Sequence, residues 1–204
     1  MESLEFEIRK PQTPRFNVGM VIAHPHPLYG GDFRNIIVRK IEKYCSQIIP
    51  TLRFNFRGVG SSTGQYSNGI GEKEDVKQMV SLLMEKIPEL SNVIVAGYSF
   101  GAAVGCSVAA NDHRICAYIA VAFPFNMFLK HAEESNCSKP KLFIIGSKDD
   151  FTPLSDFEKW FEEFKEPKEK LILEGVDHFF GGNSDEVGIA AAEFVKKICE
   201  SRGV

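Results

Sequence analysis

Short apolar runs alternate with amphipathic segments along the whole chain of 204 residues. The runs are rich in residues that favour strands, whereas the segments between them repeat apolar residues three and four positions apart, as helices do. The predicted strands are Leu4–Ile8, Val18–Ala23, Thr51–Phe54, Val93–Ala96, Ile115–Val121, Lys141–Ile145 and Lys170–Leu173. The predicted helices are about Arg34–Gln47, Glu72–Lys86, Gly101–Ala110, Leu154–Phe164 and Asp185–Glu200.

This alternation predicts a three-layer α/β fold, with a mostly parallel, twisted sheet of about seven strands and helices on both faces. Central strands such as Val93–Ala96 are apolar throughout, as strands covered on both faces are. No repeat or low-complexity linker divides the chain, so we expect one domain over residues 1–204. The least regular stretch, Phe123–Pro140, is too short to form a separate lid, so no cap domain is expected.

The stretch Ser91–Asn111 has no charged residue over 21 positions, which is about the length of a membrane span. It opens with three β-branched residues and contains three glycines, so we interpret it as a buried strand that leads into a buried helix. The amino terminus lacks the apolar core of a signal peptide. We therefore expect no membrane span and a cytoplasmic location.

Composition narrows the possible functions. The 24 Lys and Arg against 27 Asp and Glu give a net charge of −3, which does not indicate a nucleic-acid partner. The length is below the roughly 250 residues of most TIM barrels. An odd number of widely spaced cysteines without a CxxC motif argues against a disulfide framework or a zinc site. These cysteines are Cys45, Cys106, Cys116, Cys137 and Cys199.

A candidate nucleophile follows the strand Val93–Ala96. Residues 97–101 read GYSFG, a complete G-x-S-x-G motif centred on Ser99, and a helix rich in alanine and glycine comes next. In this motif the serine lies on a sharp turn from strand to helix, and small residues two positions away let the two elements approach. The strand before and the helix after it favour this interpretation over a chance glycine turn. Ser107, inside the helix, is expected to serve packing.

A serine needs a base, and the base needs an orienting acid. Residues 146–153, GSKDDFTP, follow a later strand and present Asp149 as the first candidate acid, with Asp150 as the alternative. The last predicted strand is followed by GVDHFFGG, which places His178 in the loop before the final helix. The order nucleophile, acid, base is the one expected in this fold. The alternative role for Asp149 and Asp150 is to form a turn. Asp177 is expected to form a local turn or to serve as a surface partner of other residues.

The loop after Val18–Ala23, residues 24–31, reads HPHPLYGG and is the candidate oxyanion loop. An acyl-transfer site needs two N–H donors for the developing oxyanion. One is expected from Phe100, the residue after the nucleophile, and the other from this loop. Prolines have no N–H, which leaves His26 or Leu28 as the backbone donor, and the Tyr29 hydroxyl could assist.

Metal catalysis is a competing interpretation of the same loop. His24 and His26 are two positions apart, so on one strand they would share a face and could bind one ion. Such sites need further histidines after later strands, and the chain has only five. We therefore expect neither a metal nor another cofactor, and we interpret His24 as a buried residue that holds the loop. His113 and His131 lie in polar segments and are expected to be solvated.

Residues 57–64, RGVGSSTG, could be mistaken for a nucleotide-binding loop. The glycine spacing is G-x-G-x-x-x-G, and further glycines delay the next helix to Glu72. Without a helix amino terminus at the loop, the mechanism of phosphate binding is missing. We therefore expect Arg57 to fix this loop by hydrogen bonds rather than to bind phosphate.

Taken together, these segments resemble the α/β-hydrolase superfamily, and in particular its small capless members near the dienelactone-hydrolase-like and acyl-peptidase-like groups. The resemblance spans nearly the whole chain, although many members have His-Gly where this chain has His24-Pro25. It implies a triad of Ser99, His178 and Asp149, with an oxyanion hole near His26 and Phe100. The motifs are HPHPLYGGDFRN at His24–Asn35, RFNFRGVGSSTGQYSNGIGE at Arg53–Glu72, GYSFGAAV at Gly97–Val104, GSKDDFTP and GVDHFFGG.

The resemblance implies a serine hydrolase that cleaves a carboxyl ester, thioester or small amide through an acyl-enzyme. A serine nucleophile argues against the chemistry of dienelactone hydrolases, which use cysteine. The expected partner is a small-molecule acyl substrate, and the protein is a monomer or a homodimer. Tyr29, Phe100 and the segment Phe123–Phe128, with Phe123 and Phe125 as the first candidates, could line an apolar acyl pocket or belong to the core. The alternative function is that of a non-catalytic relative that acts as a binding or scaffold protein.

Overall fold

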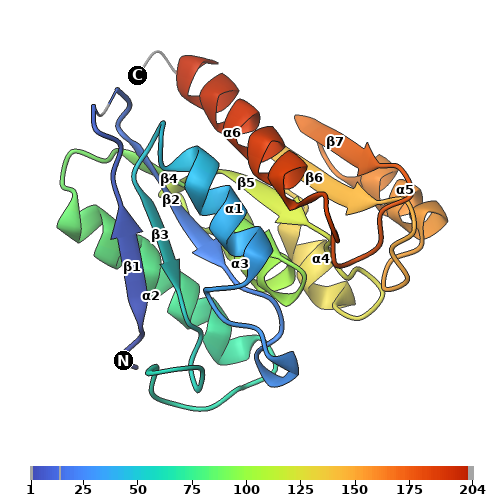
Figure 1. Cartoon of the computed structure of the whole chain (residues 1–204), viewed down its shortest axis with the longest axis horizontal. Helices are drawn as coiled ribbons and strands as arrows, with labels where there is room; N and C mark the ends of the chain where they lie inside the picture. Colours follow the sequence, from blue (N-terminus) through green and yellow to red (C-terminus); the bar gives the residue numbers. More distant parts are fainter. Residues whose placement is uncertain (1, 14, 202–204) are drawn as a thin grey trace.

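A seven-stranded sheet runs through the middle of the molecule (Figure 1). The structure is a computed structural model, and it describes residues 2–13 and 15–201. The strands lie in the order β1-β3-β2-β4-β5-β6-β7. All neighbouring strands are parallel except the edge strand β1, which pairs antiparallel with β3. The strands are β1 (Phe6–Arg9), β2 (Val18–Ala23), β3 (Thr51–Phe54), β4 (Asn92–Tyr98), β5 (Ile115–Val121), β6 (Lys141–Gly146) and β7 (Lys168–Leu173).

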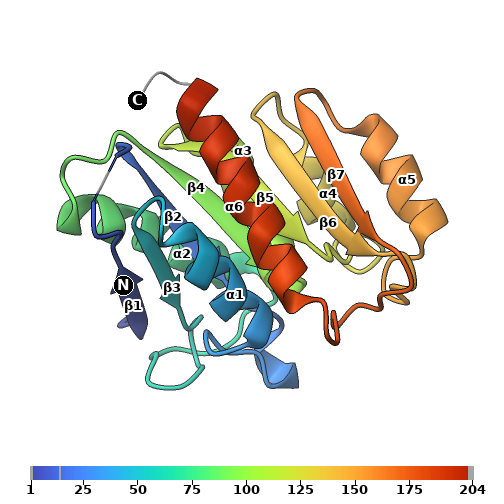
Figure 2. The same ribbon diagram turned by 45° about the horizontal axis from the view of Figure 1, so that its top comes forward.

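Helices cover both faces of the sheet (Figure 2). Two of them, α1 and α6, pack against each other on one face, and the other four pack on the opposite face. A short 3-10 helix, η1 (Pro27–Tyr29), follows β2. The α-helices of the described chain are α1 (Ile36–Cys45), α2 (Ile70–Lys86), α3 (Phe100–Asn111), α4 (Leu129–Ser135), α5 (Leu154–Glu163) and α6 (Ser184–Ser201).

The central strands supply both layers of core because successive side chains point to opposite faces. In β2, Met20 and Ile22 are buried against the layer that contains α1 and α6, whereas Val21 and Ala23 are buried against the other layer. All six residues of this strand are buried, which explains why its sequence shows no polar alternation.

The three-layer α/β architecture predicted from the sequence is confirmed. The sheet and its two helical layers account for the elements of residues 2–13 and 15–201, and no cap is present among them. The uncharged stretch Ser91–Asn111 forms β4 and α3, as expected. Among the helices of the described residues, none has the length and apolar character needed to cross a membrane.

Two details of the prediction were wrong. The first strand occupies Phe6–Arg9 rather than Leu4–Ile8, and a short helix, α4, forms inside the stretch expected to be irregular. The sequence of α4, LKHAEES, has no apolar stripe, so its periodicity gave no signal. The helix forms because it packs on α3, where Ala132 is fully buried.

Candidate active site

Ser99 lies on a sharp turn between β4 and α3, at the carboxyl edge of the sheet. Its φ of 54° and ψ of −119° are strained for a residue with a side chain. The glycines on either side make this turn possible. A Cβ at Gly97 would collide with the carbonyl oxygen of Gly101, and a Cβ at Gly101 would collide with that of Ala23. The G-x-S-x-G spacing is therefore required by close backbone approach.

The structure brings Ser99, His178 and Asp149 together from three loops. The Nε2 atom of His178 is 3.0 Å from the Ser99 hydroxyl, and its Nδ1 atom is 2.8 Å from Asp149 Oδ2. His178 and Asp149 are both buried. In this arrangement the ring donates its Nδ1 hydrogen to the carboxylate and accepts the serine hydroxyl hydrogen at Nε2.

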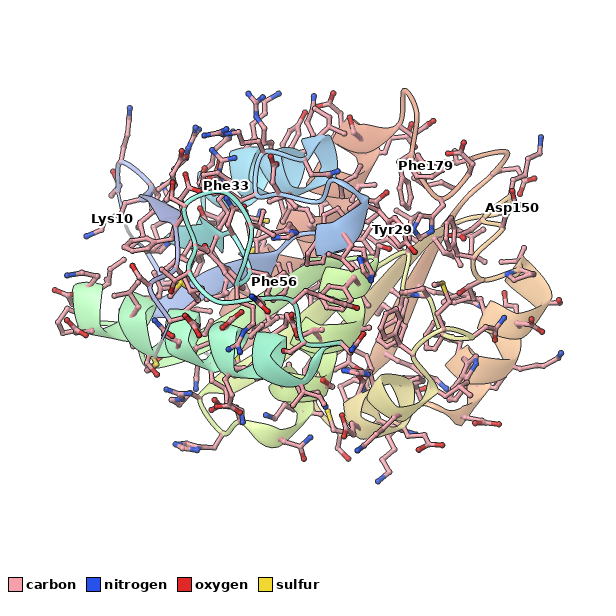
Figure 3. All side chains as sticks on the ribbon, turned by 90° about the horizontal axis from the view of Figure 1, so that it is seen from below. Lys10, Tyr29, Phe33, Phe56, Asp150 and Phe179 are labelled. Atoms are coloured by element: carbon pink, nitrogen blue, oxygen red, sulfur yellow. The ribbon has the colours of Figure 1, made fainter. Side chains whose placement is uncertain are left out.

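Asp149 rather than Asp150 faces the histidine. The second carboxylate oxygen of Asp149 accepts hydrogen bonds from the backbone N–H groups of Phe151 and Thr152, at 2.9 and 3.1 Å. These bonds fix the orientation of the carboxylate toward His178. Asp150 is exposed, and its place at the surface is visible in Figure 3.

Tyr98 also holds the histidine loop, a role that the sequence did not reveal. Its hydroxyl donates a 3.0 Å hydrogen bond to the backbone carbonyl of His178. Burial raises the pKa of Tyr98, so the phenol stays protonated and able to donate. Within the G-x-S-x-G motif this tyrosine occupies a position that can hold any residue, so the motif gave no reason to single it out.

The loop after β2 places the His26 ring 5.0 Å from that of Phe100, the residue after Ser99. The backbone N–H of Leu28 donates to His26 Nδ1 at 3.2 Å, and His26 Nε2 is 3.0 Å from the Tyr66 hydroxyl. Burial lowers the pKa of His26, which favours the neutral ring, although the charge of Glu72 opposes the shift. Because Nδ1 is the acceptor, the neutral ring carries its hydrogen on Nε2 and donates it to Tyr66. The backbone N–H of Leu28, the alternative candidate for the oxyanion hole, is thus already used in the hydrogen bond to His26.

His24 is buried, and its hydrogen bonds fix the loop, as expected. Its Nδ1 donates to the carbonyl oxygen of Pro25 at 2.6 Å, and its Nε2 accepts the backbone N–H of Phe56 at 3.0 Å. Both ring nitrogens are therefore engaged by the protein. Within the described residues, no group of three or more His, Cys, Asp and Glu side chains is arranged to hold a metal ion.

His24 should make the stability of the protein sensitive to acid. Burial lowers its pKa from the ordinary 6.5 to about 4. The unfolded chain therefore binds a proton below about pH 6.5 that the folded chain does not bind until about pH 4. Unfolding becomes easier as the pH falls through this window, and the shift corresponds to about 3 kcal/mol.

Urea denaturation at a series of pH values measures this effect. In a His24→Gln variant, whose amide oxygen can reach the position of Nε2 and accept the Phe56 N–H but does not titrate, the free energy of unfolding should fall less between pH 6.5 and pH 4. If the free energy of unfolding depends on pH in the same way in the variant and the wild type, His24 is not the source of the acid sensitivity.

A cavity of about 490 Å³ opens onto Ser99 and His178. Its wall is mostly aromatic or apolar, and the residues that line it include no Lys, Arg, Asp or Glu. Figure 3 shows two of these residues, Tyr29 and Phe179, on the same side of the molecule. The lining residues are Pro25, His26, Tyr29, Gly30, Gly31, Asn35, Tyr98, Ser99, Phe100, Pro124, Met127, Phe128, Phe151, His178 and Phe179.

The expected pocket residues divide between cavity and core. Tyr29 and Phe100 line the cavity as anticipated. Phe123 and Phe125 do not, because they are 2% and 1% exposed, stack on each other at 4.4 Å between ring centroids, and belong to the core beneath α5. Their assignment to the substrate pocket was wrong. Phe128, in the same segment, is the phenylalanine that reaches the cavity.

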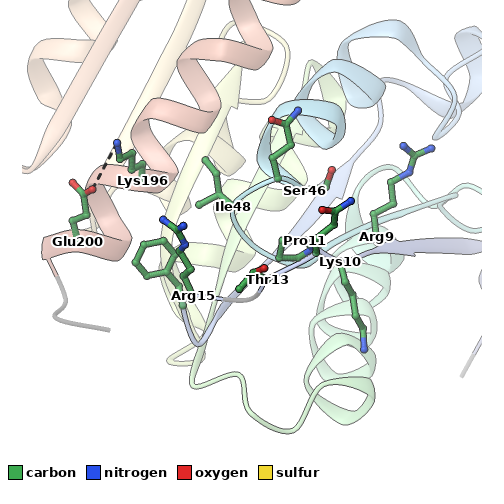
Figure 4. A pocket seen from close by; sticks show the side chains of 12 residues that line it. Arg9, Lys10, Pro11, Thr13, Arg15, Ser46, Ile48, Lys196 and Glu200 are labelled. Atoms are coloured by element: carbon green, nitrogen blue, oxygen red, sulfur yellow. Dashed lines mark ion pairs between the residues drawn. The ribbon is translucent and has the colours of Figure 1, made fainter.

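A larger cavity of about 900 Å³ lies far from Ser99, near the amino ends of the central strands (Figure 4). Its basic side chains include Lys10, which Figure 3 places on the opposite side of the molecule from Tyr29, and Arg15. Lys196, also in its wall, is paired with Glu200 at 3.9 Å. No serine beside a histidine lines this cavity, so the triad geometry is absent from it.

Two further expectations concern loops around the site. Arg57 fixes the glycine-rich loop through ion-paired hydrogen bonds to the buried Asp75, as predicted. This loop holds Tyr66 against His26. His131 is not simply solvated, because its Nε2 is buried beside Gly69 and burial lowers its pKa.

The fold and the site together define a class of protein. A mostly parallel sheet, a serine on a strained turn after its central strand, and histidine and aspartate on loops after the last two strands are the features of α/β hydrolases. A model of the alpha/beta hydrolase domain matches residues 30–201. The chain therefore belongs to the alpha/beta hydrolase family, as the sequence motifs predicted.

Known proteins similar to this chain agree. An uncharacterised protein of Rickettsia prowazekii is 27% identical over 200 residues, which cover 94% of this chain and 84% of that protein. An alpha-beta serine hydrolase homologue from Coxiella burnetii shares 32% identity and a TM-score of 0.86, over 93% of this chain and 90% of the other. A serine hydrolase without a lid from Xanthomonas campestris shares 24% identity and a TM-score of 0.85, over 97% of this chain and 89% of that chain. The family match and the similarity to the Coxiella protein support hydrolase activity, and the likeness to the Xanthomonas protein shows the fold.

Proposed function

We propose that this protein is a serine hydrolase that cleaves carboxyl esters through an acyl-enzyme on Ser99. The observation that supports this most directly is the continuous hydrogen-bonded chain from the Ser99 hydroxyl through His178 to Asp149. It lies at the wall of an uncharged cavity, where a small acyl substrate could enter.

Acylation begins when the Ser99 oxygen attacks the ester carbonyl carbon. His178 Nε2 takes the serine proton as the new bond forms, and Asp149 stabilises the imidazolium ion that results. His178 then gives this proton to the alcohol oxygen, and the bond between that oxygen and the carbonyl carbon breaks. The alcohol leaves, and the acyl group remains on Ser99.

We propose that two backbone N–H groups stabilise the oxyanion. Phe100 is the first residue of α3, where an N–H has no acceptor within the helix and the positive end of the helix dipole adds to its effect. In the loop, Pro25 and Pro27 have no N–H, and Leu28 uses its own to bond His26 Nδ1. We therefore assign the second donor to the backbone N–H of His26, which has no acceptor among the described residues.

Deacylation repeats the same steps with water. His178 removes a proton from a water molecule, which attacks the acyl carbon, and then returns the proton to Ser99. The cavity is open and no cap covers it among the described residues, so water can reach the acyl-enzyme. An open site also favours short acyl groups, and the same mechanism would accept thioesters and small amides.

A fluorophosphonate probe tests the proposal. We expect stoichiometric labelling of the folded protein, with the modified peptide containing Ser99 in a mass-spectrometric digest. Labelling should disappear in Ser99→Ala and after unfolding in urea, because the probe requires an activated serine. Absence of labelling on the folded protein would favour a non-catalytic binding or scaffold role. Labelling that survives Ser99→Ala would place the nucleophile elsewhere.

A further inference from the structure

Two exposed phenylalanines stand directly beside the candidate triad. Phe151 follows the GSKDD segment and Phe179 follows His178, and their side chains are 41% and 64% exposed. The only other phenylalanine in these two loops, Phe180, is 1% exposed. Exposed aromatic surface gathered at a cavity is typical of a binding site rather than of packing. The mechanism described above uses the backbone N–H of Phe151 to orient Asp149 but gives the two phenylalanine side chains no role.

The two rings form a corner against the histidine. The centroid of the Phe151 ring is 4.3 Å from that of His178, with an interplanar angle of 38°. The Phe179 ring lies 5.6 Å from the same imidazole, nearly perpendicular to it at 87°. The two phenylalanines are 6.3 Å apart and also perpendicular. A flat group can therefore stack on one ring while its edge meets the face of the other.

The chemistry of the reaction places the alcohol of the ester at this corner. His178 Nε2 gives its proton to the leaving oxygen, so that oxygen must come within hydrogen-bond distance of the imidazole. The rest of the alcohol then emerges beside the histidine, and Phe151 and Phe179, which line the cavity and contact this ring, are the neighbouring surface.

The charge of the cavity narrows the chemistry of that alcohol further. No Lys, Arg, Asp or Glu side chain lines the cavity, and burial lowers the pKa of His26, which favours its neutral ring. An alcohol with a charged group would lose hydration here without gaining an ion pair. An aromatic alcohol gains both burial of apolar surface and the favoured contact geometry of aromatic pairs.

We propose that Phe151 and Phe179 form the leaving-group subsite and that it selects uncharged esters of aromatic alcohols. This inference rests on the proposed function. With benzyl acetate, the bond between Ser99 Oγ and the acetyl carbonyl carbon forms, and the bond between that carbon and the benzyloxy oxygen then breaks. The serine proton passes through His178 to the benzyl oxygen, and benzyl alcohol leaves.

The test compares kcat/KM for benzyl acetate and allyl acetate. The two share one acyl group, and their alcohols are of similar acidity, so the ratio reports contacts of the alcohol rather than its reactivity. We expect benzyl acetate to be preferred by about tenfold or more, and each of Phe151→Ala and Phe179→Ala to reduce that preference severalfold. In the double variant, the ratio of kcat/KM for benzyl acetate to kcat/KM for allyl acetate should fall close to one.

Phe6→Ala is the matched control, because Phe6 is an equally simple phenylalanine, 38% exposed, on the distant edge strand β1. It should leave the ratio unchanged. All variants should still be labelled on Ser99 by a small fluorophosphonate, which shows that the triad is intact.

The outcomes separate the two proposals. Labelling with a benzyl-to-allyl ratio near one, or with a ratio that the double variant does not change, would overturn the subsite while leaving the serine hydrolase in place. Absence of labelling in the wild type would overturn both.

Discussion

Replacing Ser99 with alanine should lower kcat for a short-chain ester by about 10⁶-fold, the scale found when a serine nucleophile is removed from a complete triad. The hydroxyl that His178 Nε2 contacts at 3.0 Å is the only atom lost, so neither the cavity nor the turn needs to change. Initial rates with p-nitrophenyl acetate, corrected for spontaneous hydrolysis, measure the effect.

Ser107→Ala is the matched control. This serine lies in α3, is buried, and donates to the carbonyl oxygen of Val104, away from the cavity lining. Its loss should cost about 1 kcal/mol of stability and leave kcat within about twofold of the wild type. If the wild type and Ser99→Ala hydrolysed p-nitrophenyl acetate at equal rates, the proposed mechanism would be contradicted.

Asp149→Asn should reduce kcat by about 10⁴-fold, because the change reverses the hydrogen-bond direction at the histidine. Asp149 Oδ1 accepts two backbone N–H groups, from Phe151 and Thr152. An asparagine would keep its oxygen there and turn its NH₂ group toward His178 Nδ1. That nitrogen would then have to accept, so the hydrogen would move to Nε2, which could no longer take the serine proton.

Asp150→Asn tests the same chemistry at the neighbouring position. Asp150 is exposed and does not line the cavity, so its variant should keep nearly full activity. Steady-state rates for both variants decide between the two aspartates. A large loss in Asp150→Asn with little loss in Asp149→Asn would show that the assignment of the acid is wrong.

The sequence located the candidate site because of how parallel strands end. The carboxyl ends of such strands meet at one edge of the sheet, so residues in the loops after β4, β6 and β7 must lie near each other. Ser99, Asp149 and His178 each follow one of these strands, and their order along the chain matches the fold. Local spacing and strand order were therefore sufficient to bring together residues up to 79 positions apart.

Other parts of the site could not be predicted from the sequence. Phe123, Phe125 and Phe128 lie in one short aromatic segment, and nothing local separates the two that enter the core from the one that reaches the cavity. The contact of Tyr66 with His26 spans 40 positions, and that of Tyr98 with the carbonyl of His178 spans 80. Such contacts depend on the path that whole loops take through space. That path produces no periodic pattern in the local sequence, so it could not be predicted.

The sequence by itself determined the layers of the fold, the strained turn at Ser99 and the order of the candidate triad, because each follows from local spacing, backbone sterics or the direction of parallel strands. Only the tertiary structure decided which aromatic rings are buried and which face the cavity. It also placed Asp149 rather than Asp150 in hydrogen-bond contact with His178, and it engaged the Leu28 N–H in a hydrogen bond to the His26 ring. Those choices depend on how the loops pack against one another, and loop packing combines contributions from segments that are distant in sequence.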